Sequence, residues 1–376
     1  MGNHPPLFTM RIKIPEKISK RGVFHLGWAC DLKCPFCYYR DMDDRSFMPI
    51  GPVKRIIKSF KRFYDIKQID YTGGEPTLYK DLNPLLKWTK DQGIDPTVIT
   101  HGLYMDKVTE PCEFLISVHD VGERANKIAG RKDFFKLQSE QIKKVSNYRT
   151  NTTVYKDNYE HLEELAKYLV TTKTKVHNFI MFNPFISKSN FDKIFIEFTK
   201  VRPHIERAID ILEGKGIKVN VRYVPFCMLP NNHRNIVDWH QLQFDKDEWV
   251  NLAWHQKPSD MYFDPYQWYQ AKEADYAVLQ LGAVKRRVTY SDITEAPFIE
   301  WGHRQTQNLK YFKNEKCEGC GLNDVCDGFA GNYIAHFGTK EIDPIYINPP
   351  VVDVNTFRDD YENTCCNTKQ SAIYTD

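Results

Sequence analysis

The sequence predicts an α/β protein in two parts, a partial (β/α)6 barrel of the TIM-like type and a smaller α+β domain after it. Short β-rich runs alternate with longer amphipathic runs from residue 22 to about residue 224, the pattern of parallel strands joined by crossover helices. Beyond Pro225 this periodicity weakens. Residues 225–376 also hold most of the tryptophans and a second cluster of cysteines, which indicates a separate domain.

Six β-rich runs are the strand candidates of the barrel, and a seventh run follows them. They lie at 23–28, 68–72, 97–100, 114–118, 149–154, 178–182 and 217–224. Helix starts are predicted between them at Pro52, Asp81 and Asn158. The segment 159–170 carries its apolar residues on one face, and one long helix is predicted over 191–212.

These runs divide the chain into four predicted segments. They are an N-terminal extension (1–21), the barrel (22–224), a cysteine-containing domain (225–345) and a C-terminal tail (346–376). We expect the tail to be extended and to wrap back over the body of the protein.

Composition narrows the class of protein. The 376 residues are 41% hydrophobic and 27% charged, which is a globular composition. Fifty-two basic residues against 49 acidic ones leave a net charge of +3, so the sequence predicts no nucleic-acid or membrane partner. We find no apolar leader and no run of 18 apolar residues, and therefore expect a cytoplasmic protein whose reduced thiols hold metal.

Three cysteines lie within the stretch "GWACDLKCPFCYYRD". Three residues separate Cys30 from Cys34, and two separate Cys34 from Cys37. A structural zinc site needs four ligands, and only His25 is near enough in sequence to complete one. An iron-sulfur cube tolerates three thiolates and leaves one iron open to a substrate or cofactor, so we favour the cube.

A glycine-rich stretch, "YTGGEP", ends the next predicted strand. Gly73 and Gly74 would let the backbone approach a ligand closely, and Glu75 supplies a carboxylate. The carboxyl ends of parallel strands lie at one edge of a sheet, where ligands bind. We therefore expect this loop and the cysteine loop to face one site.

These two motifs together carry a resemblance to a known family. The spacing of the three cysteines, with Phe36 before the last, followed one βα unit later by Gly73-Gly74-Glu75-Pro76, resembles the radical S-adenosylmethionine (SAM) superfamily over residues 22–224. The resemblance implies a 4Fe-4S cluster whose open iron binds SAM, and an external electron donor such as flavodoxin or ferredoxin. It also implies a 5′-deoxyadenosyl radical that abstracts hydrogen from a substrate.

The same resemblance implies a set of SAM contacts. Ser117 in "ISVHD" and Arg124 in "RANKIAGRKDFF" fit positions of this kind, with Arg131 as the rival of Arg124. Thr153 and Asn151 near the end of the fifth strand are expected to alternate in direction, so that at most one of them faces inward. The predicted contacts are Gly73, Gly74, Glu75, Ser117, Arg124, Thr153 and Asn183.

A second cluster of thiols, Cys317, Cys320 and Cys326, lies in "CEGCGLNDVCDG". Its spacing alone fits zinc as well as iron, with His336 or Cys227 as a fourth ligand. After a radical SAM barrel, the segment resembles the auxiliary-cluster part of SPASM and twitch domains. Ala330 stands where the full SPASM pattern has another cysteine, so one auxiliary 4Fe-4S cluster is expected.

The fourth ligand of that cluster is predicted to be Cys227, because it lies at the domain junction. Cys365 and Cys366 near the C-terminus are the alternatives, and Cys112 is predicted to be a core residue.

From the resemblance we expect an oxidoreductase-type enzyme whose auxiliary cluster assists a net oxidation or rearrangement. Only 29 residues precede Cys30, too few for the winged-helix domain of many peptide-modifying relatives, which favours a small-molecule or carbohydrate-like substrate. Maturation of a ribosomally made peptide is the alternative. A non-catalytic metal-binding scaffold is the third reading.

Overall fold

A computed structural model describes most of the barrel and part of the C-terminal region. The described residues are 21–37, 45–64, 66–146, 148–181, 191–237, 252–254, 311–326, 328–352 and 354–357. Among them, no helix combines the length and the apolar character needed to cross a membrane. The predicted contact Asn183 and the cysteines Cys365 and Cys366 lie outside these residues.

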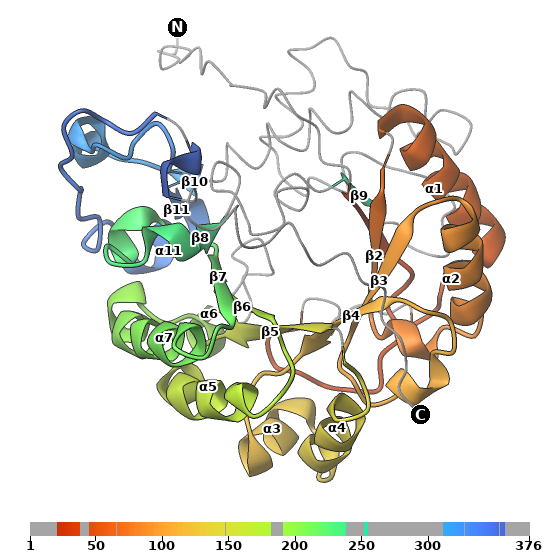
Figure 1. Ribbon diagram of the computed structural model, residues 1–376. Coiled ribbons are helices and arrows are strands. Elements are labelled where there is room, and N and C mark those ends of the chain that lie inside the picture. The colour runs from red at the N-terminus through yellow and green to blue at the C-terminus, as the bar shows by residue number, and fades with distance from the viewer. Residues whose placement is uncertain are drawn as a thin grey trace, which may run out of the picture.

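The described strands form one nine-stranded parallel sheet in the order β8-β7-β6-β5-β4-β3-β2-β1-β9. Strands β1 to β8 thus neighbour one another in chain order, as successive crossover connections require. The sheet curves into an open arc (Figure 1). The strands are β1 (Arg21–His25), β2 (Gln68–Thr72), β3 (Asp95–Thr100), β4 (Glu113–Ser117), β5 (Tyr148–Val154), β6 (Val176–Met181), β7 (Lys218–Arg222), β8 (Ile236–Val237) and β9 (Leu252–Trp254).

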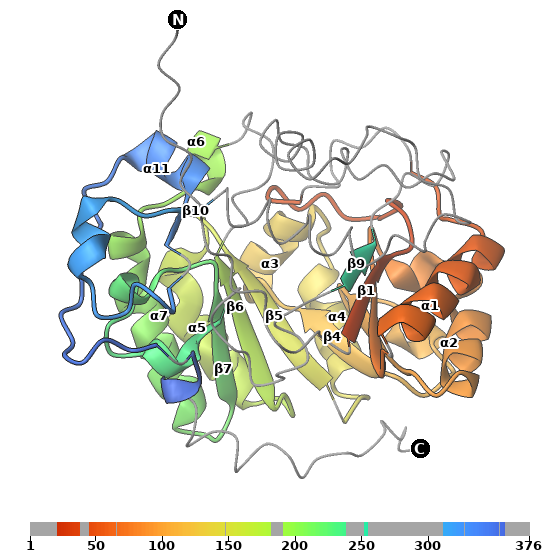
Figure 2. The ribbon, with the colours of Figure 1, turned by 90° about the horizontal axis from the view of Figure 1, so that it is seen from above.

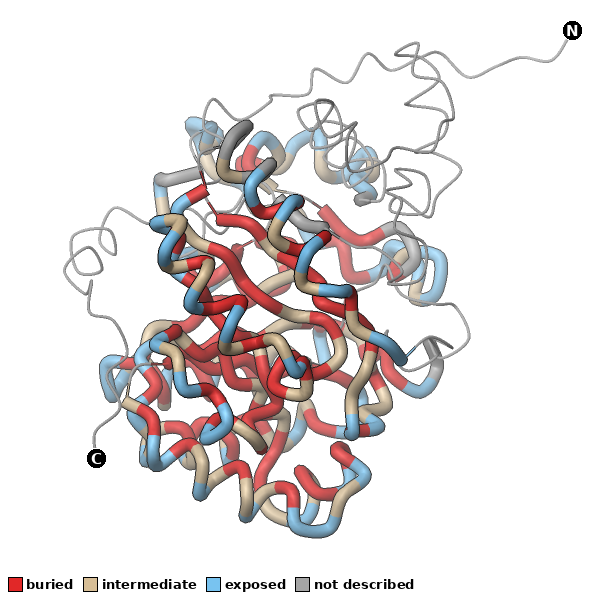
Figure 3. Tube along the Cα trace, turned by 90° about the vertical axis from the view of Figure 1, so that its right-hand side faces the viewer, coloured by how far each residue is buried: buried red, intermediate tan, exposed pale blue. Residues whose placement is uncertain are grey.

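Helices cover the outer side of this arc, and the prediction of a partial barrel is confirmed (Figure 1). The main core lies between helices and sheet, where the buried strand segments lie behind half-exposed helices (Figure 3). In β4, Phe114 and Ile116 belong to this core, whereas Leu115 and Ser117 face the inside of the arc. The helices are α1 (Ile50–Tyr64), α2 (Leu82–Asp91), α3 (Gly122–Ala129), α4 (Phe134–Ile142), α5 (Leu162–Val170), α6 (Phe191–Ile194) and α7 (Phe198–Glu213).

The C-terminal segment packs beside the β7 end of the sheet (Figures 1 and 2). It holds the antiparallel pair β10 (Tyr311–Phe312) and β11 (Phe329–Ala330), followed by α11 (Gly331–Phe337). The ring of Tyr333 stacks on Phe198 with 4.4 Å between centroids, and its hydroxyl accepts a hydrogen bond from the Phe198 N–H at 2.8 Å. From the tail, the Val351 N–H donates to the carbonyl of Gly321 in the cysteine-containing segment at 2.8 Å.

Two local predictions differ from the structure. The segment predicted as one helix over 191–212 forms two helices, α6 and α7. Phe195 and Ile196 lie between them in a non-helical connection, and both side chains are buried in the core. The first strand ends at His25 instead of residue 28. Gly27, at φ 156°, lies outside the range that ordinary strand residues adopt, and the chain turns there into the cysteine loop.

Candidate cofactor site

The cysteine loop rises from the carboxyl end of β1 and carries three half-buried thiols, those of Cys30, Cys34 and Cys37. It is held against α3 by a hydrogen bond from the Lys33 N–H to the Ala129 carbonyl at 3.2 Å. Burial raises the pKa of Cys30 to about 12, and burial beside the other two thiols also raises the pKa of Cys34. A bound metal would have to displace these thiol protons, because the thiolate is the form that ligates metal.

The Gly73–Glu75 loop follows β2 and lies directly against the cysteine loop. The Gly74 N–H donates to the Gly27 carbonyl, and the Glu75 N–H donates to the Ala29 carbonyl, both at 2.7 Å. A Cβ atom on Gly74 would lie 2.0 Å from the Ala29 oxygen. The second glycine is therefore required by the contact between the two loops.

The carboxylate of Glu75 is 1% exposed, and protein donors occupy both of its oxygens. Oε1 accepts from the Thr77 N–H at 3.0 Å and from the Thr100 hydroxyl at 2.7 Å. Oε2 accepts from the His101 N–H at 2.8 Å. Glu75 thereby ties the loop after β2 to the end of β3, and it presents no unoccupied oxygen to a ligand.

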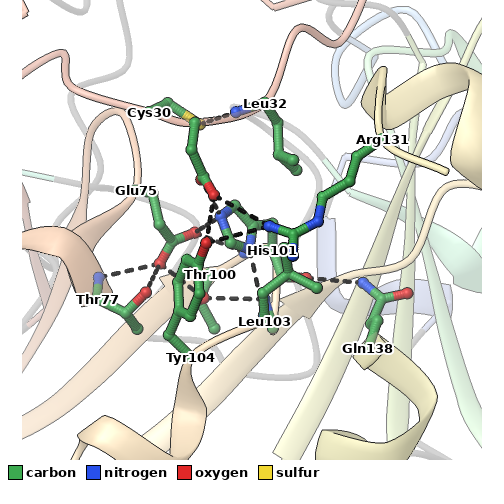
Figure 4. Close-up of polar contacts among 12 residues, drawn as sticks. Cys30, Leu32, Glu75, Thr77, Thr100, His101, Leu103, Tyr104, Arg131 and Gln138 are labelled. Carbon is green, nitrogen blue, oxygen red and sulfur yellow. Dashed lines mark hydrogen bonds and ion pairs between the residues drawn. The ribbon is translucent and has the colours of Figure 1, made fainter. Parts of the chain in front are cut away.

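His101 and Asp31 form a pair that the sequence did not single out. The His101 Nε2 lies 2.9 Å from Asp31 Oδ1, next to the Cys30 thiol (Figure 4). Asp31 also accepts a hydrogen bond from the Tyr104 hydroxyl and forms an ion pair with Arg131, which lies just before α4. Only the nearness of Asp31 to Cys30 in sequence hinted at this cluster.

Ser117 ends β4 and stands in register with Asn151 of β5. Thr153 lies two residues after Asn151 in the same strand, so both side chains face the inside of the arc. The expectation that at most one of them faces inward was wrong, because side chains two positions apart in a strand point to the same face.

His119 is a further inward residue that sequence reasoning missed. Its Nδ1 accepts from the Thr153 N–H at 3.1 Å, and its ring packs edge-on against Phe36 of the cysteine loop with 4.7 Å between centroids. Burial lowers the pKa of His119 to about 3, so the ring is neutral. Because Nδ1 is an acceptor, the ring proton lies on Nε2. The stretch "ISVHD" contained this histidine, but only its serine was selected.

The two candidate arginines lie in different surroundings. Arg124 on α3 pairs with Asp120 at 3.0 Å and also with Glu164 of α5, neither of which belongs to the cysteine loop. Arg131 lies 3.7 Å from Asp31 of the cysteine loop and 2.8 Å from Asp133. Of these two arginines, Arg131 is therefore the one that contacts the cysteine loop.

The second group of thiols converges from two distant segments. Cys317, Cys320 and Cys326 line one pocket together with Cys227, which lies in the turn after β7. Burial beside the other three thiols raises the pKa of Cys227 to about 12. His336, the alternative fourth ligand, does not line this pocket.

The spacing of the thiols bears on which metal they could hold. A tetrahedral zinc site, with Zn–S near 2.3 Å, requires sulfur atoms about 3.8 Å apart. Among the described residues, the only trio of potential ligands within 4.8 Å of one another is Cys30, Asp31 and His101. Neither set of three cysteines meets that limit among the described residues.

Comparison with known proteins identifies the family. Residues 27–169 match the Radical SAM superfamily. This part of the chain is a radical SAM domain, of a superfamily that uses a 4Fe-4S cluster and SAM, and the resemblance of the cysteine and glycine motifs is confirmed. A cysteine-rich segment follows the barrel in this chain.

Two relatives illustrate the range of similar sequences. A tungsten-containing aldehyde ferredoxin oxidoreductase cofactor-modifying protein of Pyrococcus furiosus is 21% identical over 327 residues, covering 79% of this chain and 86% of the relative. An S-adenosylmethionine-dependent nucleotide dehydratase of Flammeovirga pacifica is 28% identical over 120 residues, covering 29% of this chain and 41% of the relative.

Solved structures share the fold over most of the chain. SuiB of Streptococcus suis bound to S-adenosylmethionine is 19% identical with a TM-score of 0.56, covering 88% of this chain and 77% of that one. Native anSMEcpe with bound AdoMet and the Kp18Cys peptide is 15% identical with a TM-score of 0.59. The match covers 88% of this chain and 92% of that one.

Proposed function

We propose that this protein is a radical SAM enzyme that reductively cleaves SAM and abstracts hydrogen from a polar small-molecule or carbohydrate-like substrate. One observation carries the first half of the proposal. The cysteine loop and the Gly73–Glu75 loop are joined by hydrogen bonds at the carboxyl ends of β1 and β2, as a shared cofactor site requires. When bound, the cluster would supply the electron that converts SAM into methionine and the 5′-deoxyadenosyl radical.

The chain's own residues would bind and orient these cofactors. Cys30, Cys34 and Cys37 would hold the cluster, and the backbone at Gly73 and Gly74 would lie against SAM. The inward side chains Ser117 and Thr153 would face its polar groups. The apolar residues packed around the cysteine loop, Leu32, Leu103 and Phe134 among them, would exclude water.

The test is SAM cleavage by anaerobically reconstituted protein, with flavodoxin or a chemical reductant as electron donor and 5′-deoxyadenosine as the product measured. Changing Cys30, Cys34 and Cys37 together to alanine should abolish the product. Cys112→Ala, which alters a buried thiol of the main core, is the matched control and should leave cleavage intact. Full cleavage by the triple variant would overturn the proposal.

We further propose that Cys227, Cys317, Cys320 and Cys326 hold one auxiliary 4Fe-4S cluster. Support comes from the pocket that the four thiols line and from the position of Cys227 in the turn after β7. A second cluster of this kind could accept the electron left after hydrogen abstraction. The net reaction would then be an oxidation or an oxidative rearrangement.

The substrate half of the proposal is supported by the inner face of the sheet. Asn151, Asn178 and Asn220 stand in register on β5, β6 and β7, and all three are buried. Asn220 Nδ2 donates to Asn178 Oδ1 at 2.8 Å, while Asn151 Oδ1 and Asn220 Oδ1 have no hydrogen-bond partner among the described residues. Unpaired buried amide oxygens favour a ligand that is rich in hydroxyl or amino groups.

A substrate screen tests this half of the proposal. Nucleotides, sugar nucleotides and aminocyclitols should be offered beside ribosomal precursor peptides, and substrate-dependent formation of 5′-deoxyadenosine followed. Asn178→Leu with Asn220→Leu should remove the stimulation by substrate while the slow uncoupled cleavage of SAM persists. Stimulation by peptides alone would overturn the small-molecule assignment and favour peptide maturation.

A further inference from the structure

A chain of hydrogen bonds joins the Gly73–Glu75 loop to the cysteine loop through one buried imidazole (Figure 4). His101 follows β3, and its backbone N–H donates to Glu75 Oε2 at 2.8 Å. On its other side, the ring Nε2 lies 2.9 Å from Oδ1 of Asp31, the residue after Cys30. The loops that follow β1, β2 and β3 therefore meet at His101.

The tautomer of His101 follows from its contacts. The Leu103 N–H donates to Nδ1 at 3.2 Å, so the proton of the neutral ring lies on Nε2 and is donated to Asp31. The same Nε2 lies 3.3 Å from Glu75 Oε2. Because the side chain is only 9% exposed and lies between two carboxylates, the ring has one favourable orientation.

Asp31 is the link between this ring and an arginine. Its Oδ2 accepts from the Tyr104 hydroxyl at 2.5 Å and lies 3.7 Å from Nη1 of Arg131. The Tyr104 oxygen in turn accepts from Arg131 at 3.2 Å. The position of the Arg131 guanidinium therefore depends on Asp31.

The backbone beside Cys30 has few other anchors. The Ala29 carbonyl binds the Glu75 N–H, and the Lys33 N–H binds the Ala129 carbonyl. Between these two points, no backbone hydrogen bond joins residues 30–32 to another element of the described chain. The side chain of Asp31 supplies the polar tether of this segment.

We propose that His101 is a positioning residue of the cofactor site, which through Asp31 fixes the Cys30 segment and Arg131 relative to the Gly73–Gly74 backbone. This role rests on the proposed function, because it assumes that these thiols hold a cluster and that SAM lies against the glycines. His101 itself would touch neither the reacting atoms nor the substrate. Its effect would be to keep the two loops at a fixed separation.

The test uses full-length protein and the variants His101→Leu, Asp31→Ala and the double change. Each single variant should weaken SAM binding about tenfold, the effect typical of residues that orient metal ligands, while four irons per N-terminal cube are retained. Each should also alter the change that SAM causes in the electron paramagnetic resonance spectrum of the reduced cluster. The double variant should be no worse than either single one, because both break the same link.

Two further variants separate positioning from simple stability. His101→Gln keeps a donor toward Asp31 and should restore most of the SAM affinity. His161→Leu breaks a similar pair, His161 with Asp120 at 3.1 Å, and should leave SAM binding and the spectrum unchanged. Asp31→Ala remains informative if His101→Leu does not fold, since the Asp31 side chain is 29% exposed.

Hydrogen exchange in the cluster-free protein gives a readout that does not depend on activity. Peptides covering residues 26–37 should exchange faster in His101→Leu and Asp31→Ala than in the wild type or His161→Leu. Unchanged exchange together with unchanged SAM affinity would overturn the positioning role and leave the proposed function standing. A wild-type protein that gathers no cluster would contradict the proposed function, and exchange would still decide the role of His101.

Discussion

The amide nitrogen of Glu75 lies 2.7 Å from the carbonyl oxygen of Ala29, and this hydrogen bond places the glycine loop directly against the cysteine loop. A second bond of 2.7 Å joins Gly74 to Gly27 beside it. The two loops therefore form a single unit at the carboxyl ends of β1 and β2. A change in either loop is expected to move both.

Replacing Gly74 with valine tests this coupling. The new Cβ would lie 2.0 Å from the Ala29 oxygen and 2.6 Å from the carbonyl carbon of Trp28, so the cysteine loop must shift. We expect Gly74→Val to lose iron from the N-terminal site as well as SAM affinity, measured as iron per chain and by equilibrium binding. Gly51→Val is the control, because a Cβ on Gly51 meets only the end of Arg55 at 3.8 Å. Retention of full iron by Gly74→Val would contradict the coupling.

Local patterns in the sequence predicted much of the fold. Alternation of β-rich and amphipathic runs was enough for the parallel sheet, because each βα unit buries its own apolar face. The cysteine spacing and the Gly73–Glu75 motif could also be recognised in the sequence, because each is a local pattern. Each of these signals lies within a few neighbouring residues.

Contacts between distant loops could not be predicted in this way. His101 and Asp31 are 70 positions apart, and no local pattern shows that they meet. The row formed by Asn151, Asn178 and Asn220 depends on the register of three strands. The preference for Arg131 over Arg124 likewise depends on carboxylates from other elements.

Glu75 is expected to contribute strongly to stability. Its carboxylate is 1% exposed and accepts hydrogen bonds from Thr77, Thr100 and His101. Glu75→Gln would turn amide hydrogens toward some of these donors, at a cost of about 2–3 kcal/mol in the free energy of unfolding. Urea unfolding of the cluster-free protein measures this loss in the free energy of unfolding. Glu140→Gln, a change at an exposed residue, is the control. A loss no larger than that of the control would show that the Glu75 contacts are weak.

The auxiliary site predicts a specific iron count. With two cubes, the wild-type chain should carry about eight irons, and the triple variant of Cys30, Cys34 and Cys37 should keep about four. Cys227→Ala should make the remaining cluster labile, whereas Cys112→Ala should not, since Cys112 lies in the main core. The same change at Cys365 or Cys366 should also leave the cluster intact. Stoichiometric zinc with a single cube would contradict the auxiliary cluster and the net oxidation inferred from it.

Acid should destabilise the cluster-free protein through His177. This side chain is fully buried in β6, its Nδ1 lies 2.8 Å from the Thr150 hydroxyl, and burial lowers its pKa to about 3. An unfolded histidine has a pKa near 6.5, so below that pH the unfolded state binds a proton that the folded state does not. Stability from this group is therefore complete above about pH 6.5 and falls as the pH drops toward 3.

The measurement is the slope of the free energy of unfolding against pH. One such proton changes the free energy of unfolding by about 1.4 kcal/mol per pH unit, and His177→Gln should remove that part of the slope between pH 6 and pH 4. Urea unfolding at pH 8 supplies the reference, because there the wild type and the variant differ only by the pH-independent cost of the change. If both proteins kept the same slope below pH 6, His177 would not be the buried neutral histidine that its surroundings indicate.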